Sequence, residues 1–181
     1  MNKSKGKFTN PLMAALKFDE DDLAVNRAGN VSEGQYRRLR NQRDALLWPF
    51  AGLLVIGGVG GVIGFARVDP DSGLVIWIIF VIVAVGFVGT VLFLTWINLA
   101  KDLGGGYVAA IEGRVQLDVK GKGNIIRYTV GIDYQFFPVD KATFLAFKNG
   151  DPYRIYFAPN TKTILSAEWL YDSVFYEGEP S

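Results

Sequence analysis

Two long apolar runs dominate the hydrophobic pattern of this chain, and neither contains a charged residue. They extend from Ala45 to Ala66 and from Gly73 to Ala100, and only Arg67–Ser72 separates them. Each run exceeds the roughly 20 residues that a helix with a rise of about 1.5 Å per residue needs to cross a hydrocarbon core about 30 Å thick. The polar, proline-containing break requires the chain to reverse. The pattern therefore predicts a transmembrane helical hairpin with spans at about 46–66 and 74–99.

The residues before the first run show no sustained hydrophobic period. Residues 1–31 combine a lysine-dotted start with the acidic cluster Asp19–Asp22, and we interpret them as a mostly flexible tail with a short helix around Leu12–Phe18. The acidic cluster lacks the alternating ligands and central glycine of a calcium loop. A solvated run of charges is therefore the favoured interpretation.

A helix is predicted directly before the first apolar run. Ser32 and Gln35 have the spacing of a capping box, so this helix is expected to begin near Glu33. Pro49 is the next helix breaker, and it marks either a kink or the start of a new helix. We group this basic helix and the hairpin together as residues 32–100.

Beyond a predicted joint at Gly104–Gly106 the apolar residues begin to alternate with polar ones, as is typical of strands. Two antiparallel strands are predicted on either side of a glycine-rich loop at Lys120–Gly123. One face of this pair carries Val115, Leu117, Val119, Ile126, Tyr128, Val130 and Ile132. Phe136–Pro138 then ends the second strand or leads into a bend, and Lys141–Lys148 forms a third strand or a helical turn.

The remaining residues predict shorter elements. A strand is expected at Tyr153–Phe157, a short closing strand at Ile164–Leu165 and a helical turn at Ser166–Tyr171. Four or five strands in about 65 residues predict a small antiparallel, barrel-like domain of SH3 or OB character over 104–175, followed by an acidic tail at 176–181. The predicted fold class is an α+β membrane protein with a two-span hairpin and a small soluble β-domain.

Charge is nearly balanced, with a formal net charge of +1, but its distribution predicts a topology. Four arginines precede the first run, Arg67 alone lies in the connecting loop, and Lys101 follows the second run. Because basic residues favour the cytoplasmic side, we expect a multi-pass protein with both termini in the cytoplasm, in the inner membrane if the cell is bacterial. The four arginines are alternatively a site for anionic lipid headgroups. They are Arg37, Arg38, Arg40 and Arg43.

Tryptophans and glycines refine the predicted hairpin. Trp48 and Trp96 fall at the expected cytoplasmic ends of the spans and Trp77 near the opposite end, where indole rings prefer headgroup depth. Small residues that allow close helix packing recur on both spans. They are Gly57, Gly60, Gly61 and Gly64 on the first span and Gly86 and Gly89 on the second. Packing within the hairpin, self-association and docking onto another membrane protein remain open as their role.

Candidate chemistry is sparse. Cysteine and histidine are absent, which excludes thiolate nucleophiles, disulfides, zinc sites built on these residues and imidazole bases. Glu112 and Asp133 lie on strands that could pair two carboxylates, and the aromatic residues of the β-domain could stack on nucleic-acid bases, but we favour a core role for the aromatics. We expect no catalytic site, no metal, no cofactor and no nucleic-acid partner.

The segments Gly150–Pro159 and Ile164–Glu168, behind a two-helix anchor, resemble those of a group of uncharacterised small prokaryotic-type membrane proteins with a compact cytoplasmic β-domain. The resemblance covers about residues 107–170. The arrangement is also similar to membrane-anchored OB-fold proteins that accompany membrane proteases and scaffold proteins. The resemblance implies an anchor and a β-domain, and neither group supplies catalytic residues.

These patterns together predict a function. We expect a non-enzymatic integral membrane adaptor, or an accessory subunit of a larger membrane complex, acting through protein–protein interaction. The alternative is a membrane-anchored sensor whose β-domain binds a lipid or a small molecule. The expected partners are membrane lipids and either another membrane protein or further copies of this chain.

Overall fold

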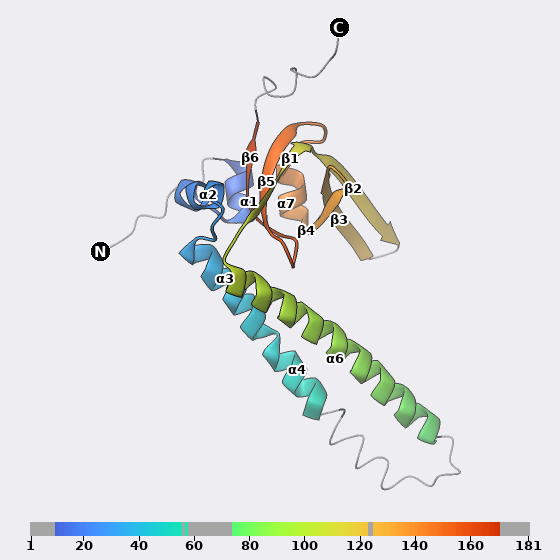
Figure 1. Ribbon diagram of the computed structural model, residues 1–181. Coiled ribbons are helices and arrows are strands. Elements are labelled where there is room, and N and C mark those ends of the chain that lie inside the picture. The colour runs from blue at the N-terminus through green and yellow to red at the C-terminus, as the bar shows by residue number, and fades with distance from the viewer. Residues whose placement is uncertain (1–9, 56, 58–73, 123–124, 171–181) are drawn as a thin grey trace. The chain divides into compact units, whose positions relative to one another are not determined.

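A computed structural model of the chain describes residues 10–55, 57, 74–122 and 125–170 (Figure 1). It divides into two compact units. The first, here called the sheet unit, contains the residues up to Tyr36 together with those from Gly105 onward. The second, the helical unit, is Arg37–Gly104. Each unit is described by itself.

The sheet unit contains six strands arranged as two antiparallel three-stranded sheets. The strands are β1 (Ala109–Arg114), β2 (Gln116–Lys122), β3 (Ile125–Ile132), β4 (Gln135–Val139), β5 (Pro152–Ala158) and β6 (Thr163–Trp169). Their order is β1-β5-β6 in one sheet and β2-β3-β4 in the other. The fold is therefore α+β, as predicted. The barrel-like closure is not confirmed, because the described strands form two open sheets.

The predicted pair of strands around the glycine-rich loop is confirmed as β2 and β3, with Val119 opposite Tyr128. Between β4 and β5 the chain forms the short helix α7 (Lys141–Ala146), which decides between the two alternatives for that segment. Pro138 lies within β4, an edge strand, where the missing N–H of proline is tolerated.

The helical turn predicted from Ser166 is wrong over the described residues. Ser166 through Trp169 continue β6, in which Ala167 lies opposite Ile155 of β5. Ser166 and Ala167 are both buried. Pairing and burial against β5 therefore override a local pattern that is too short to favour either state.

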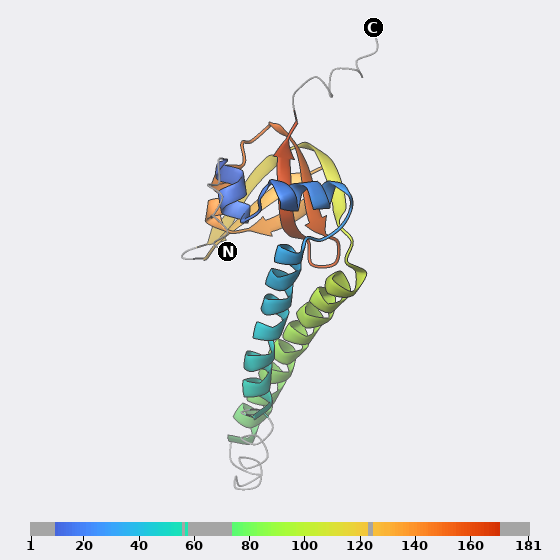
Figure 2. The ribbon, with the colours of Figure 1, turned by 90° about the vertical axis from the view of Figure 1, so that its left-hand side faces the viewer.

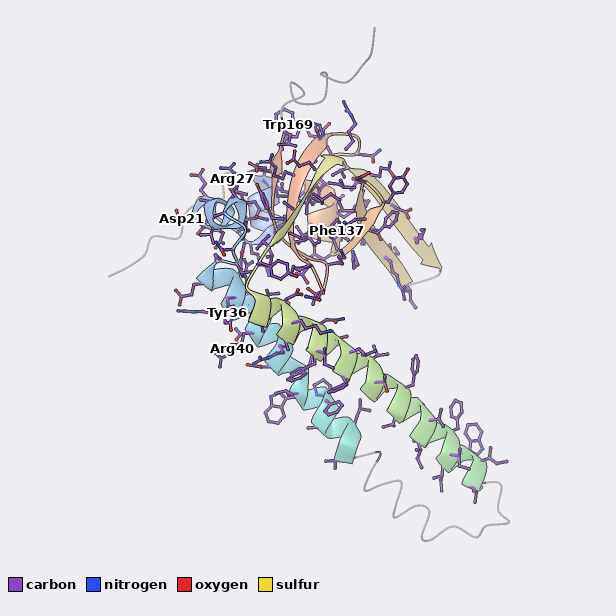
Figure 3. The ribbon with its side chains drawn as sticks, viewed as in Figure 1. Asp21, Arg27, Tyr36, Arg40, Phe137 and Trp169 are labelled. Atoms are coloured by element: carbon purple, nitrogen blue, oxygen red, sulfur yellow. The ribbon has the colours of Figure 1, made fainter. Side chains whose placement is uncertain are left out.

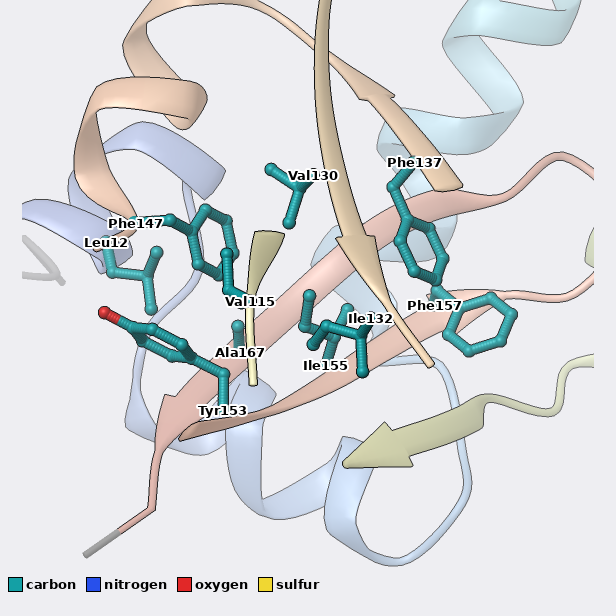
Figure 4. Packing of buried hydrophobic residues seen from close by; sticks show 10 residues of the cluster. All are labelled: Leu12, Val115, Val130, Ile132, Phe137, Phe147, Tyr153, Ile155, Phe157 and Ala167. Atoms are coloured by element: carbon teal, nitrogen blue, oxygen red, sulfur yellow. The ribbon is translucent and has the colours of Figure 1, made fainter. Parts of the chain in front are cut away.

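The core of the sheet unit lies between the two sheets (Figure 4). Val115, Val130 and Ile155 are fully buried there, and the rings of Phe137 and Phe157 meet edge to face with centroids 4.9 Å apart. Leu12, from far upstream in the sequence, reaches the same cluster. Tight packing of this kind makes each large-to-small substitution costly, because the surroundings collapse only partly.

The N-terminal segment differs from the predicted flexible tail. Its described part forms α1 (Pro11–Leu16) and α2 (Glu20–Arg27), and Figure 2 shows α2 lying across the sheet that contains β6. Phe18 and Leu23 are buried against Tyr156 of β5. The short helix predicted around Leu12–Phe18 is confirmed in part by α1, whereas α2 was not predicted, and burial of apolar side chains on the sheet stabilises helices that are too short to be stable alone.

The acidic cluster lies at the N-terminus of α2 and caps this helix. Asp19 is the N-cap of α2, and its side chain accepts a hydrogen bond of 2.8 Å from the backbone N–H of Asp22. The other acidic residues occupy the first turn of α2, where negative charge interacts favourably with the helix dipole.

The capping box predicted the start of α3 (Glu33–Ala45) correctly. The N–H of Gln35 donates to the hydroxyl of Ser32, and the N–H of Ser32 donates to the side chain of Gln35, both at 3.2 Å. A new helix, α4 (Leu47–Leu54), follows directly. Pro49 lies in its first turn, where no backbone N–H is required, and the break between the two helices falls at Leu46, which itself has helical backbone angles.

The helical unit ends in α6 (Leu74–Gly105), which begins at the predicted start of the second span and continues past its predicted end. Gly104 and Gly105 belong to this helix, and the predicted joint is reduced to Gly106, whose φ is 61°. In the described part of the chain, Val75–Gly105 is the one helix long and apolar enough to cross a membrane. Of the predicted first span at about 46–66, residue 56 and residues 58–66 lie outside the described residues.

Candidate docking surfaces and their supporting contacts

The glycine-rich face of the predicted hairpin is described at three of its six positions. Gly57 packs against α6, because a Cβ placed on it would lie 2.6 Å from Cγ1 of Val85. This approach is closer than any side chain permits, so the absence of a Cβ is what brings the two segments together. Gly60, Gly61 and Gly64 lie outside the described residues.

Gly86 and Gly89 are placed differently, because apart from the adjoining part of α6 no described residue has an atom within 4 Å of a Cβ built on either of them. They line an open apolar groove of about 400 Å³ between α4 and α6. Phe50, Leu53, Val85, Thr90 and Phe93 complete its lining. The hydroxyl of Thr90 donates to the carbonyl of Gly86 at 2.9 Å, so its polar group is satisfied within the helix. Among the described residues, the contact inside the unit thus uses Gly57, and none of their side chains covers the α6 glycines.

The three tryptophans predicted as interface anchors differ in exposure. Trp48 on α4 and Trp77 on α6 are 82% and 67% exposed. Trp96 instead stacks on Phe93. These two residues line a cavity of about 150 Å³ together with four further apolar residues, which belong to α4, to α6 and to the position just before α4. The indole N–H of Trp96 is buried and has no hydrogen-bond partner among the described residues.

The four predicted headgroup-binding arginines lie on α3 (Figure 3 labels Arg40). Asp44 contacts two of them, at 3.8 Å from Arg40 and at 2.7 Å from Arg43. Arg37 and Arg38 belong to the preceding turns of the same helix. The segment from Arg37 to Asp44 therefore contains four arginines and one aspartate, which gives it a net positive charge immediately before α4.

A buried polar network joins α2, α3 and β6 in the sheet unit. The side-chain amides of Asn26 and Gln35 bond each other reciprocally, with N···O distances of 2.8 and 2.9 Å. Ser166 donates to the oxygen of Asn26 at 2.5 Å, and Gln35 donates to the carbonyl of Leu165 at 3.2 Å. All three polar side chains are at most 1% exposed. Because buried polar groups are costly only when unpaired, this network stabilises one arrangement of the helices on the sheet.

A bulge in β6 explains the last of these bonds. The register passes from Ser166 opposite Tyr156 to Ile164 opposite Phe157, so Leu165 has no partner residue on β5. The Gln35 side chain satisfies the carbonyl that the bulge turns away from the ladder. The sequence predicts Gln35 as a cap, but its contact with residue 165 follows only from the fold.

A second network, of charged groups, lies on the same face of the sheet. Arg27 of α2 pairs with Glu168 of β6 (Arg27 is labelled in Figure 3). Arg154 of β5 lies between two carboxylates, 2.6 Å from Glu112 and 3.4 Å from Glu168. The hydroxyl of Tyr156 also donates to Glu168, at 2.7 Å. Two arginines thus balance two carboxylates.

These contacts determine how the groups titrate. Burial alone would raise the pKa of Glu168, but hydrogen bonds from Arg27 and Tyr156 and the nearby positive charges hold it below its ordinary value. Burial raises the pKa of the Tyr156 hydroxyl, and its hydrogen bond to Glu168 raises it further. Because the Glu168 carboxylate stays charged and the Tyr156 hydroxyl stays protonated, their contacts with Arg27 hold α2 against the sheet.

Two chemical alternatives from the sequence find little support in the geometry. Glu112 faces Arg154 on β5, whereas Asp133 lies in the turn between β3 and β4 with a φ of 43°, so their strands do not pair. Of the aromatic residues, Tyr153, Tyr156 and Phe157 are buried, as a core role predicts. Tyr134 is 95% exposed and stands outside this cluster.

The described residues contain no group of three or more acidic, histidine or cysteine side chains placed to hold a metal ion. Comparison of the chain with protein-family models, curated proteins and solved structures gives no match.

Proposed function

We propose that this chain is a non-enzymatic integral membrane protein that acts as an adaptor or accessory subunit of a larger membrane complex. In this proposal the two apolar runs form a two-span hairpin with both termini in the cytoplasm, and the membrane is the inner membrane if the cell is bacterial. The proposal has three supports: the uncharged runs, the arginines before the first run, and the exposure of α6.

The observation that carries the proposal is the open groove along α6. Gly86 and Gly89 have the small-residue character that lets helices approach closely in lipid, yet α4 leaves them uncovered. Helix association in lipid depends on packing, because lipid tails are as apolar as the side chains they would replace. A helix of another membrane protein is the occupant that fits an apolar groove with small residues at its base.

The test is affinity purification of the full chain from native membranes in mild detergent, with identification of co-eluting proteins. Gly89→Leu would fill the groove, and Phe87→Leu is the matched control because Phe87 is exposed and does not line it. We expect one membrane protein to co-purify stoichiometrically with the wild type and with Phe87→Leu, and to be lost from Gly89→Leu. A partner that Gly89→Leu retains, or a chain purified alone, contradicts the proposal. If only an oligomer of this chain is recovered, the helix that occupies the groove belongs to a second copy of the chain and not to another membrane protein.

The alternative function is a membrane-anchored sensor whose β-domain binds a lipid or a small molecule. One observation favours it: the β2–β3 hairpin exposes apolar side chains beside basic ones. Thermal unfolding of the full chain in one fixed lipid composition with added metabolites tests the small-molecule form of this alternative, because a sensor is stabilised by its ligand and an adaptor is not.

A further inference from the structure

The apolar face of the β2–β3 hairpin continues beyond the core that it helps to form. Val130 of β3 is completely buried, and Tyr128 and Ile126 lie on the same face because side chains alternate along a strand. Ile126 is 54% exposed, and Val119, opposite Tyr128 on β2, is 52% exposed. The end of the hairpin therefore presents apolar surface that no described residue covers.

The opposite face of the same hairpin end is basic. Arg127 of β3 is exposed and lies opposite Lys120 of β2. The ammonium of Lys120 is 3.0 Å from the carboxylate of Asp118 on the same face, and Arg127 adds a positive charge beside this pair. Exposed Ile125 shares this face. An apolar face backed by cationic side chains is typical of elements that rest at the surface of an anionic membrane.

The position of the hairpin within the sheet unit fits such a surface. The chain enters β1 through Gly106–Val108, and both Figure 1 and Figure 2 place this entry and the free end of the β2–β3 hairpin at the same lower edge of the sheet unit. Only Gly106–Val108 separates the end of α6 from β1. Four residue steps reach at most about 14 Å. The first residue of β1 is therefore tethered within about 14 Å of the end of α6, the helix that would cross the membrane.

We infer that the free end of the β2–β3 hairpin docks on the anionic lipid surface beside α6, with Val119 and Ile126 in the headgroup region and Arg127 facing lipid phosphates and carboxylates. This inference rests on the membrane placement in the proposed function, and it adds a lipid contact that holds the sheet unit against the bilayer. The negative potential of a cytoplasmic leaflet falls off within about a Debye length, roughly 10 Å, so Arg127 contributes to docking only when the hairpin end rests against the lipid surface.

The test uses the absence of cysteine from the chain. The full chain carrying a single cysteine is labelled with an environment-sensitive fluorophore and reconstituted into vesicles whose lipids carry a nitroxide quencher. Ile126→Cys reports on the hairpin, and Trp169→Cys is the control at the upper edge of the sheet unit (Figure 3). Ile79→Cys, on exposed α6, reports whether the helix has entered the bilayer. The vesicles are either phosphatidylcholine alone or phosphatidylcholine with phosphatidylserine.

We expect the probe at Ile126 to be quenched in vesicles with phosphatidylserine and the probe at Trp169 to remain unquenched. In the same vesicles, Arg127→Gln is expected to lower the ratio of docked to undocked hairpin about fivefold, since one basic residue near an anionic surface contributes that factor. Because no partner protein is present, this result is independent of the accessory-subunit proposal.

Two results overturn the inference, and they are distinguishable. If the Ile79 probe is quenched while those at Ile126 and Trp169 are equally exposed to water, the hairpin does not dock although the helix spans the bilayer. If the Ile79 probe is not quenched, the membrane placement fails and the inference fails with it. Quenching at Ile126 that is equal in both vesicle types and insensitive to Arg127→Gln contradicts the electrostatic part of the argument.

Discussion

Substitution of Gln35 by methionine tests the buried network that ties α2 and α3 to β6. The side-chain amide of Gln35 makes four hydrogen bonds, two with Asn26 and one each with Ser32 and the carbonyl of Leu165. Methionine has a similar length, so Gln35→Met removes all four bonds without opening a large cavity. The experiment therefore measures the effect of the lost hydrogen bonds on stability separately from the effect of lost packing.

The cost follows from which groups lose their partners. Asn26 keeps bonds to Ser166 and to the carbonyl of Asn30, whereas the carbonyl of Leu165 and the N–H of Ser32 each lose a bond in a buried position. A buried polar group left unsatisfied costs about 1–3 kcal/mol. Two such groups, partly offset by the apolar methionine side chain, predict a loss of about 3 kcal/mol in the free energy of unfolding.

The assay is urea unfolding of the full chain in mild detergent, followed by near-UV circular dichroism. At a denaturant slope of about 2 kcal/mol per molar, a loss of about 3 kcal/mol lowers the midpoint by about 1.5 M. Gln42→Met, at an exposed position of the same helix, is the control and is expected to change stability by less than about 0.5 kcal/mol. Equal midpoints for the two variants would refute the reasoning.

Three further predictions follow from other contacts. Because Arg27 and Tyr156 hold the pKa of Glu168 below its unfolded value, the wild type should lose stability as pH falls from about 5 through the folded pKa, whereas Glu168→Gln should show a flatter pH dependence in the same unfolding assay. Asp140 caps α7 by accepting from the N–H of Thr143 at 2.7 Å, so Asp140→Ala should cost about 1 kcal/mol near neutral pH, and this difference should shrink in acid as the wild-type carboxylate is protonated. Gly57→Leu should lower the thermal midpoint measured by circular dichroism in detergent, since its Cβ meets Val85, whereas Gly86→Leu should leave it unchanged; equal effects would contradict the assigned packing.

The sequence determined the features that depend on local pattern. The start of α3 follows from Ser32 and Gln35, because a capping box is satisfied within four residues. The β2–β3 pair follows from alternation around a glycine-rich loop, and α6 follows from a long uncharged run. The amino acids alone also exclude cysteine and histidine chemistry.

Tertiary structure decided the features that depend on residues far apart in the chain. The polar N-terminal segment becomes ordered because Phe18 and Leu23 find apolar partners on β5, and no local signal foretells that burial. The pairing of Arg27 with Glu168 spans 141 residues of sequence, and the division of the strands into two sheets depends equally on distant pairing. Local periodicity reports which side of an element is apolar, but the identity of the surface that covers it is a property of the folded chain.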